Sequence, residues 1–166
     1  MYDYIILGGG SAGCVLANRL STNPKNKVLL IEAGGSDKHP YIRIPAGEIK
    51  AIQSNRFNWH YKSETDPSLN NRANVWPAGK VLGGSSSING MVYIRGQKED
   101  YDSWSTLVSN TGEWAYEDVL NYFKKMETNP LKNSKYHGYD GPLQVSNVPT
   151  PHPITKAFID SSVEVG

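Results

Sequence analysis

The stretch Gly8-Gly9-Gly10-Ser11-Ala12-Gly13 decides the fold, and it stands between two apolar runs. The runs are Tyr-Ile-Ile-Leu at residues 4–7 and Val-Leu-Leu-Ile at residues 28–31. Each has the composition of a short strand that is buried on both faces. Residues 12–20 between them have helical composition, with apolar side chains recurring on one face. The sequence therefore predicts a strand–helix–strand unit with parallel strands, the start of an α/β fold.

Three glycines in this turn fit the pattern G-x-G-x-x-G, and each has a physical task. Gly8 permits a tight turn, Gly10 lets a pyrophosphate approach the backbone, and Gly13 lets the helix pack closely on the strand. The helix that starts at Ser11 and Ala12 presents unpaired N–H groups and a partial positive charge. We therefore predict a dinucleotide-binding turn.

Glu32 ends the second strand, where a carboxylate can accept hydrogen bonds from a ribose. The same carboxylate would repel a 2′-phosphate, which disfavours NADP. Two alternatives are an ordinary glycine-rich turn and the nucleophile elbow of hydrolases, because residues 9–13 also match G-x-S-x-G. The hydrolase interpretation leaves Glu32 unexplained and places Ser11 directly after the first strand.

Composition excludes several function classes. With 17 basic and 16 acidic residues the net charge is +1, so nothing indicates a nucleic-acid partner or an acidic membrane surface. No apolar run approaches the ~20 residues of a transmembrane segment, and the N-terminus does not resemble a signal peptide. The single cysteine, Cys14, excludes an internal disulfide, and we expect a cytoplasmic protein. His39 has no partner at a metal-ligand spacing, so we predict no metal site.

A second informative stretch covers residues 76–96. Gly83 and Gly84 allow a close backbone approach, and the three serines at 85–87 offer N-caps for a helix carrying Ile88, Met91 and Val92. A glycine–serine turn onto a helix start can bind an anion or a polar ring. Taken alone, it could equally be a well-capped helix without a ligand.

Residues 79–90 (Gly-Lys-Val-Leu-Gly-Gly-Ser-Ser-Ser-Ile-Asn-Gly), with Tyr93 and Gly96 downstream, resemble the first signature of the glucose–methanol–choline (GMC) flavoprotein oxidoreductases. The resemblance covers essentially the whole chain and is greatest to the choline-dehydrogenase and alkanol-dehydrogenase branch. Further matches lie at residues 58–61, 100–104, 116–123 and 136–143.

The resemblance implies an α/β fold whose Rossmann-like FAD-binding domain is incomplete in this chain, followed by the start of a substrate domain. We expect the N-terminal part of the FAD-binding domain at residues 1–142, with an excursion at 36–75. The substrate-binding domain would begin at residues 143–166.

The resemblance also implies a role for each matching site residue. The FAD pyrophosphate would contact Gly8, Gly10, Ser11, Ala12 and Gly13, with Glu32 on the adenosine ribose and Ala33 beside the adenine. The ribityl–pyrophosphate segment would pass Gly79, Lys80, Val81, Gly83 and Gly84. The isoalloxazine would lie against Ser85, Asn89, Gly90, Met91 and Val92, with backbone N–H groups near Asn89 and Gly90 as candidates to meet flavin N5 and O4. Some members attach FAD through a histidine where Ile88 stands here, so the expected FAD is noncovalent.

The implied activity is FAD-dependent oxidation of an alcohol to an aldehyde or ketone, by hydride transfer to flavin N5. In the GMC family the catalytic histidine and its partner lie near the C-terminus of a longer chain, so no catalytic residue is assigned here. The expected partners are a small-molecule alcohol and either a C-terminal remainder of the enzyme or a companion chain. The alternatives are a non-redox hydroxynitrile lyase-like member and an inactive fragment that binds FAD or a partner.

The remaining pattern predicts mainly architecture. Helices are expected from residue 100, over 116–126 and over 154–165, a strand at 143–145, and a short strand within 48–74. We also consider a substrate-access role for His137, in a glycine-flanked loop. Only two segments resemble central parallel strands, and a two-stranded sheet apolar on both faces cannot bury itself. Either unusual segments or further chain must complete the core.

Overall fold

The computed structural model describes residues 1–108 and 113–166. The chain divides into two compact units, Met1–Val92 and Tyr93–Gly166. This boundary differs from the domain boundary expected at residue 142. Because the two units are defined by compactness and not by what they bind, the assignment to FAD-binding and substrate-binding domains stays a prediction.

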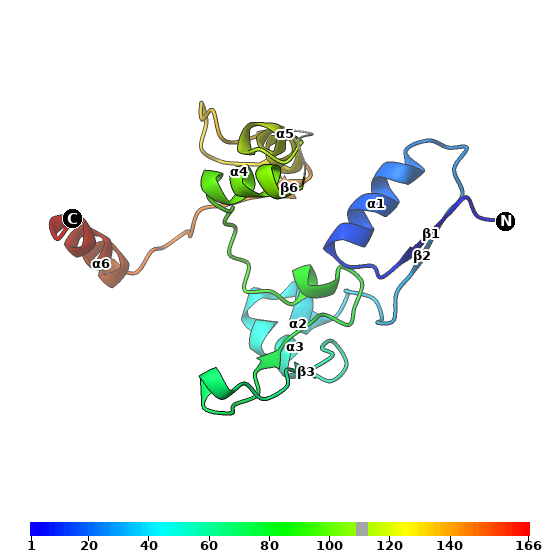
Figure 1. Cartoon of the computed structure of the whole chain (residues 1–166), viewed down its shortest axis with the longest axis horizontal. Helices are drawn as coiled ribbons and strands as arrows, with labels where there is room; N and C mark the ends of the chain where they lie inside the picture. Colours follow the sequence, from blue (N-terminus) through cyan, green and yellow to red (C-terminus); the bar gives the residue numbers. More distant parts are fainter. Residues whose placement is uncertain (109–112) are drawn as a thin grey trace. The chain divides into compact units, whose positions relative to one another are not determined.

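The first unit begins with the predicted strand–helix–strand arrangement, which is confirmed. Strands β1 (Tyr4–Leu7) and β2 (Val28–Ile31) are parallel and in register, with Tyr4 opposite Val28. Helix α1 (Ser11–Ser21) connects them and lies along the strand pair (Figure 1). The backbone N–H of Gly8 donates to the carbonyl oxygen of Ile31 at 2.8 Å, which continues the ladder to the point where the chain turns.

The β1–β2 sheet is open on much of its surface. Ile6 is buried, with 8% of its surface exposed, whereas Ile5 is 60% and Leu7 80% exposed. Two strands and one helix cannot enclose an apolar sheet, as the sequence indicated. The described residues leave this sheet without a complete core of its own.

The rest of the first unit is an excursion of short elements packed around a small apolar core. Ala51, Phe57, Val81 and Ile88 form this core, so the excursion and the second glycine-rich stretch share one interior. Strands β3 (Tyr61–Lys62) and β4 (Val75–Trp76) pair antiparallel, and β3 is the short strand expected within residues 48–74. The elements are α2 (Pro40–Arg43), η1 (Pro45–Gly47), α3 (Glu48–Gln53), β3 (Tyr61–Lys62), η2 (Pro67–Leu69) and β4 (Val75–Trp76).

The prediction of a helix that carries Ile88, Met91 and Val92 is wrong. Only a 3₁₀ helix, η3 (Gly84–Ser87), forms, and residues 88–97 contain no helix or strand. The side-chain Oδ1 of Asn89 accepts a hydrogen bond from the Met91 N–H at 3.0 Å, and Met91 has a left-handed φ of 57°. This local turn competes successfully with helix propagation.

The second unit contains the other predicted helices and a short parallel strand pair. Helix α4 (Lys98–Leu107) starts with a capping box between Gln97 and Asp100, and it packs on α5 (Tyr116–Met126). The remaining elements are β5 (Glu127–Thr128), which pairs with β6 (Leu143–Gln144), and α6 (Pro153–Glu164). These confirm the helices and the strand that the sequence predicted. Across the described ranges, no helix combines the length and apolarity that crossing a bilayer requires.

Candidate functional site

The two glycine-rich turns of the first unit are in direct contact. The N–H of Gly83 donates to the carbonyl oxygen of Gly9 at 2.6 Å, and the hydroxyls of Ser11 and Ser86 are hydrogen-bonded to each other. A Cβ added to Gly84 would stand 2.7 Å from the Cα of Gly10, so only glycine allows this approach. Turns that are more than seventy residues apart in sequence therefore form one surface.

Glu32 fixes the loop that faces these turns. Its Oε2 accepts a hydrogen bond from the Gly9 N–H at 2.6 Å, and its Oε1 accepts one from the Gly34 N–H at 2.8 Å. A carboxylate offers about four lone-pair positions, so it retains acceptor capacity beyond these two bonds. The carboxylate is thus oriented by the backbone before any ligand arrives.

The second glycine-rich stretch also runs beside the end of β2. Leu82 donates its N–H to the carbonyl oxygen of Gly35 at 2.9 Å, and Gly35 and Val81 form a parallel bridge. A Cβ on Gly34 would stand 2.1 Å from the Lys80 carbonyl oxygen. This tight backbone packing brings both stretches to the carboxyl end of the β1–β2 pair, where open α/β sheets bind their ligands.

A cavity of about 480 Å³ lies at this junction. Eight of the predicted cofactor-binding residues contribute to its wall, from both turns and from the end of β2. The lining residues are Leu7, Gly8, Gly10, Ser11, Ile31, Glu32, Ala33, Trp59, Gly79, Gly84 and Ser85.

Three residues of the wall, Leu7, Ile31 and Trp59, were not predicted as site residues, and of these Trp59 comes from the excursion. Its ring is stacked on Tyr61 with centroids 5.9 Å apart, and the Nζ of Lys80 lies 4.5 Å from its ring centroid. The exposed indole offers an apolar face on which a planar heterocycle could stack. The alternation of aromatic and polar residues over 57–61 indicated a short strand, but nothing in it indicated which ring would face the cavity.

Other predicted residues lie behind or away from this wall. Val81 is fully buried in the apolar core, so its side chain cannot meet a ligand. Gly13 packs α1 against the turn, since a Cβ there would stand 1.9 Å from the Gly8 carbonyl oxygen. Asn89 and Met91 line a separate cavity of about 210 Å³. The cavity of about 480 Å³ is likewise not lined by Ala12, Lys80, Gly83, Gly90 or Val92.

The geometry fits the diphosphate and ribose of a dinucleotide. Gly10 is the N-cap of α1 and provides no side-chain cap, so N–H groups of the first turn are free for an anion. A Cβ on Gly10 would meet nothing closer than 4.0 Å, which leaves room above the backbone. Glu32, which also lines the cavity, has acceptor capacity for hydroxyl groups.

A second cluster of charged groups lies in the second unit, around Glu127. This carboxylate is fully buried, and its Oε1 accepts hydrogen bonds from Arg95 Nη2 at 2.5 Å, His137 Nδ1 at 2.8 Å and the Gly138 N–H at 2.9 Å. Burial alone would raise the pKa of Glu127, but the hydrogen bonds from Gly138 and His137 and the positive charge of Arg95 outweigh it. The pKa is lowered to about 2. No motif in the sequence marks this cluster, because Arg95, Glu127 and His137 are far apart along the chain.

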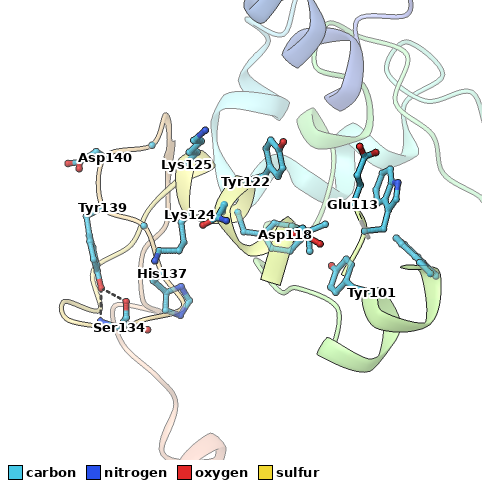
Figure 2. A pocket seen from close by; sticks show the side chains of 17 residues that line it. Tyr101, Glu113, Asp118, Tyr122, Lys124, Lys125, Ser134, His137, Tyr139 and Asp140 are labelled. Carbon is cyan, nitrogen blue, oxygen red and sulfur yellow. Dashed lines mark hydrogen bonds between the residues drawn. The ribbon is translucent and has the colours of Figure 1, made fainter. Parts of the chain in front are cut away.

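His137 also lines a broad cavity of about 1660 Å³ in the second unit, together with residues of α4, α5 and the loop before β6 (Figure 2). The His137 imidazole is hydrogen-bonded to Glu127. The substrate-access role expected of His137 stays a prediction. His39 caps α2, its Nδ1 accepting from the Tyr41 N–H at 3.2 Å. Within residues 1–108 and 113–166, no three His, Cys, Asp or Glu side chains gather as a metal site would require.

Comparison with known proteins agrees with this geometry. The sequence profile of the GMC oxidoreductase family matches residues 2–166. The chain is 49% identical over 164 residues to an oxygen-dependent choline dehydrogenase of Sinorhizobium fredii, covering 99% of this chain and 30% of that protein. It is 48% identical over 166 residues to an alcohol dehydrogenase [acceptor] of Pseudomonas putida, with the same coverage.

Among solved structures, pyridoxine 4-oxidase from Mesorbium loti superposes with a TM-score of 0.92 at 35% identity. That match covers 100% of this chain and 32% of the oxidase. The chain thus spans about 30% of the length of the curated relatives that it matches. The family match, the sequence identity and the structural superposition all agree with the contact between the two glycine-rich turns. The chain belongs to the GMC oxidoreductase family.

Proposed function

We propose that this chain supplies much of the FAD site of a flavoenzyme that oxidises an alcohol to an aldehyde or ketone. The contact between the two glycine-rich turns around the cavity of about 480 Å³ is the observation that carries the proposal. The names of the relatives, choline dehydrogenase and alcohol dehydrogenase, indicate an alcohol substrate.

Each part of the site has a proposed task. The α1 N-terminus with Gly8, Gly10 and Ser11 binds the pyrophosphate, and Glu32 accepts hydrogen bonds from the adenosine ribose. Trp59 and Ala33 border the adenine. Residues 79–85 run along the remainder of the nucleotide, and the backbone N–H groups near Asn89 and Gly90 are the candidates to meet the flavin ring.

When bound, FAD supplies the hydride acceptor at N5. The chain's own residues bind the cofactor, orient it and shield it from water. We assign no catalytic base to this chain. A C-terminal remainder of the enzyme or a companion chain has to provide that base. Because Ile88 carries no nucleophilic atom and is buried in the core, we propose that FAD is held noncovalently.

We propose the cytoplasm as the compartment, on the basis of the lone Cys14 and the absence of an internal disulfide. Separation of the cytosol from membranes and secreted material, followed by detection of the chain, tests this location.

The decisive experiment uses the chain produced together with its C-terminal portion. We expect a yellow protein whose flavin is bleached by an alcohol under anaerobic conditions and is released by acid denaturation. Flavin that remains with the denatured polypeptide would show covalent attachment. Flavin that no alcohol bleaches, together with cyanide release from a cyanohydrin, would replace the proposal with a lyase activity.

A further inference from the structure

Glu48 carries a charge that the FAD site described above does not use. It is the first residue of α3 and is half-buried. Within residues 1–108 and 113–166, its carboxylate forms neither an ion pair nor a hydrogen bond. Because water screens a half-buried charge less than an exposed one, this carboxylate acts more strongly on the groups beside it.

Other charged side chains around Glu48 already have partners. Among the described residues, Asp37, Arg43 and Glu48 are the charged ones that line the cavity of about 210 Å³. Arg43 Nη2 forms an ion pair with Asp37 Oδ2 at 2.5 Å, so these two charges neutralise each other. Lys50 of α3 lies over the Tyr41 ring, 5.5 Å from its centroid. Glu48 therefore sets the sign of the charge at this cavity.

The Glu48 carboxylate lies beside the backbone that is proposed to meet the flavin ring. Its Oε1 is 3.4 Å from the point where a Cβ on Gly90 would stand. In the part of the chain that the structure describes, the Gly90 N–H has no hydrogen-bond partner, whereas the Met91 N–H donates to Asn89 Oδ1 at 3.0 Å. The negative charge and the free N–H group are thus neighbours.

The backbone on both sides of Glu48 is fixed by close packing. Gly47 lies against Tyr41, where an added Cβ would stand 2.6 Å from the Tyr41 Cα. Ala51, in the same helix as Glu48, is fully buried in the apolar core together with Ile88. Since Ile88 directly precedes the backbone proposed to meet the flavin, one core holds both segments. The position of the carboxylate relative to that backbone therefore follows from the fold.

We propose that Glu48 lowers the reduction potential of the bound flavin. The inference rests on the proposed function, because that function places the N–H groups near Asn89 and Gly90 at flavin N5 and O4. Transfer of a hydride brings two electrons and one proton, so it adds one negative charge to the ring. A fixed carboxylate nearby disfavours this charge. Glu48 thus opposes the stabilisation that the backbone N–H groups provide, and it favours the return of electrons to the acceptor.

The reduction potential of the flavin-loaded protein, produced with its C-terminal portion, tests the proposal without any alcohol. It is measured under anaerobic conditions against a redox dye of known potential. Glu48→Gln keeps the shape of the side chain and removes its charge. We expect it to raise the potential by about 30 mV, which is about a tenfold change in the equilibrium constant of a two-electron couple. Glu48→Asp keeps the charge and should remain close to the wild-type potential.

Titration with sulfite gives a second readout that is independent of turnover. Sulfite is an anion that adds reversibly to flavin N5 and bleaches its visible absorption. Its dissociation constant should fall about tenfold in Glu48→Gln. The matched control is Glu64→Gln, which removes an exposed carboxylate of the same unit that lines none of the cavities described above. It should leave the potential unchanged and alter the dissociation constant less than about twofold.

Arg43→Gln changes the local charge in the opposite direction, at a side chain that is 59% exposed. It leaves Asp37 without its partner, so the dissociation constant for sulfite should rise about twofold. This variant provides the test if Glu48→Gln loses its flavin. An Arg43→Gln protein that binds sulfite as tightly as the wild type then overturns the inference.

The failure of this inference can be told apart from the failure of the proposed function. Wild-type flavin that an alcohol bleaches, combined with equal potentials in wild type and Glu48→Gln, overturns this inference alone. Wild-type protein that binds no flavin overturns the inference and the proposed function together.

Discussion

At Gly84 the backbone adopts a φ of 57°, and the residue lies against Gly10 of the first turn. We expect Gly84→Ala to push the two turns apart and to reduce FAD binding strongly. An added Cβ must displace backbone, and a non-glycine residue in the left-handed region adds strain of about 1–3 kcal/mol. The measurements are flavin content per protein chain and the free energy of unfolding.

Gly35→Ala is the control for this substitution. Gly35 belongs to the same site region, but a Cβ there would meet nothing within 4 Å and its φ is not left-handed. If Gly84→Ala retains as much flavin and stability as Gly35→Ala, the close contact between the turns is unnecessary.

The buried carboxylate of Glu127 should make the free energy of unfolding depend on pH. Its pKa is lowered from 4.5 to about 2, so the folded state favours the ionised carboxylate. The resulting stabilisation is present above pH 4.5 and is lost as the pH falls toward 2. It amounts to roughly 3 kcal/mol from the linkage relation. Glu127→Gln should therefore lower the free energy of unfolding at neutral pH and flatten its decrease between these pH values.

Chemical denaturation of both proteins at several pH values checks this prediction. Asp160→Asn is a useful control, because Asp160 forms an exposed pair with Lys156 in α6. Exposed pairs contribute little to stability, so this variant should follow the wild-type curve. A Glu127→Gln protein with an unchanged acid transition would show that the buried cluster does not stabilise the fold.

At the residue scale, sequence predicted those site features that depend on backbone freedom. Gly84 does make the close backbone approach expected of it, and the φ of 94° at Gly8 agrees with the expected tight turn, because the absence of a Cβ has a local meaning. The ligand contacts expected of these glycines stay predictions. Trp59 and Glu127 could not be assigned in that way. Their roles depend on which neighbours the fold brings near, and a tryptophan or glutamate is compatible with many environments.

At the scale of elements, Asn58 joins the excursion to the second glycine-rich stretch. Its buried side chain donates to the Ile52 carbonyl oxygen at 2.6 Å, and its Oδ1 accepts from the N–H groups of His60 and Ala78, both at 2.9 Å. Asn58→Ala leaves these backbone groups unsatisfied in a buried place. We expect a loss of about 1–3 kcal/mol in the free energy of unfolding.

Denaturant titration measures this loss, and Asn55→Ala provides the exposed control at a position just before the core segment. Asn58→Ala should also weaken flavin binding, because Ala78 directly precedes Gly79 on the cavity wall. Equal stability of the two variants would contradict the proposed junction.

The elements that sequence predicted correctly have a regular local signal. The apolar runs at residues 4–7 and 28–31 have the pattern of buried strands, and the apolar side chains at residues 116, 119, 120, 123 and 126 recur on one face of α5. The helix expected after Ser87 does not form, because the Asn89 side chain accepts a hydrogen bond from the Met91 N–H and Met91 adopts a left-handed φ. Composition alone does not show when a side chain will compete with the helix for a backbone N–H.

At the scale of the whole molecule, large apolar side chains are exposed in both units. Leu7 in the first unit and Phe158 in α6 are 80% and 74% exposed, respectively. We expect the chain produced alone to self-associate and to bind an apolar dye, since many large apolar side chains exposed to water promote association. Production with the C-terminal portion should suppress both effects.

Light scattering after size-exclusion chromatography distinguishes these states. A monodisperse monomer of the chain alone that retains stoichiometric FAD would show that no further covering is needed. The sequence anticipated this exposure because it contained only two central strands. It could not indicate the compact units at residues 1–92 and 93–166, which depend on contacts between distant segments.

The two hydrogen bonds that hold Glu32 limit how the nucleotide preference proposed for this site could be re-engineered. Substituting it with a neutral or basic residue, to admit a 2′-phosphorylated cofactor, would also remove the acceptor for two backbone amides, those of Gly9 and Gly34. The substitution that introduces the new charge would therefore also remove the hydrogen bonds through which Glu32 links the loop after β2 to the first turn. A successful redesign must therefore supply a substitute acceptor for both amides along with the altered charge.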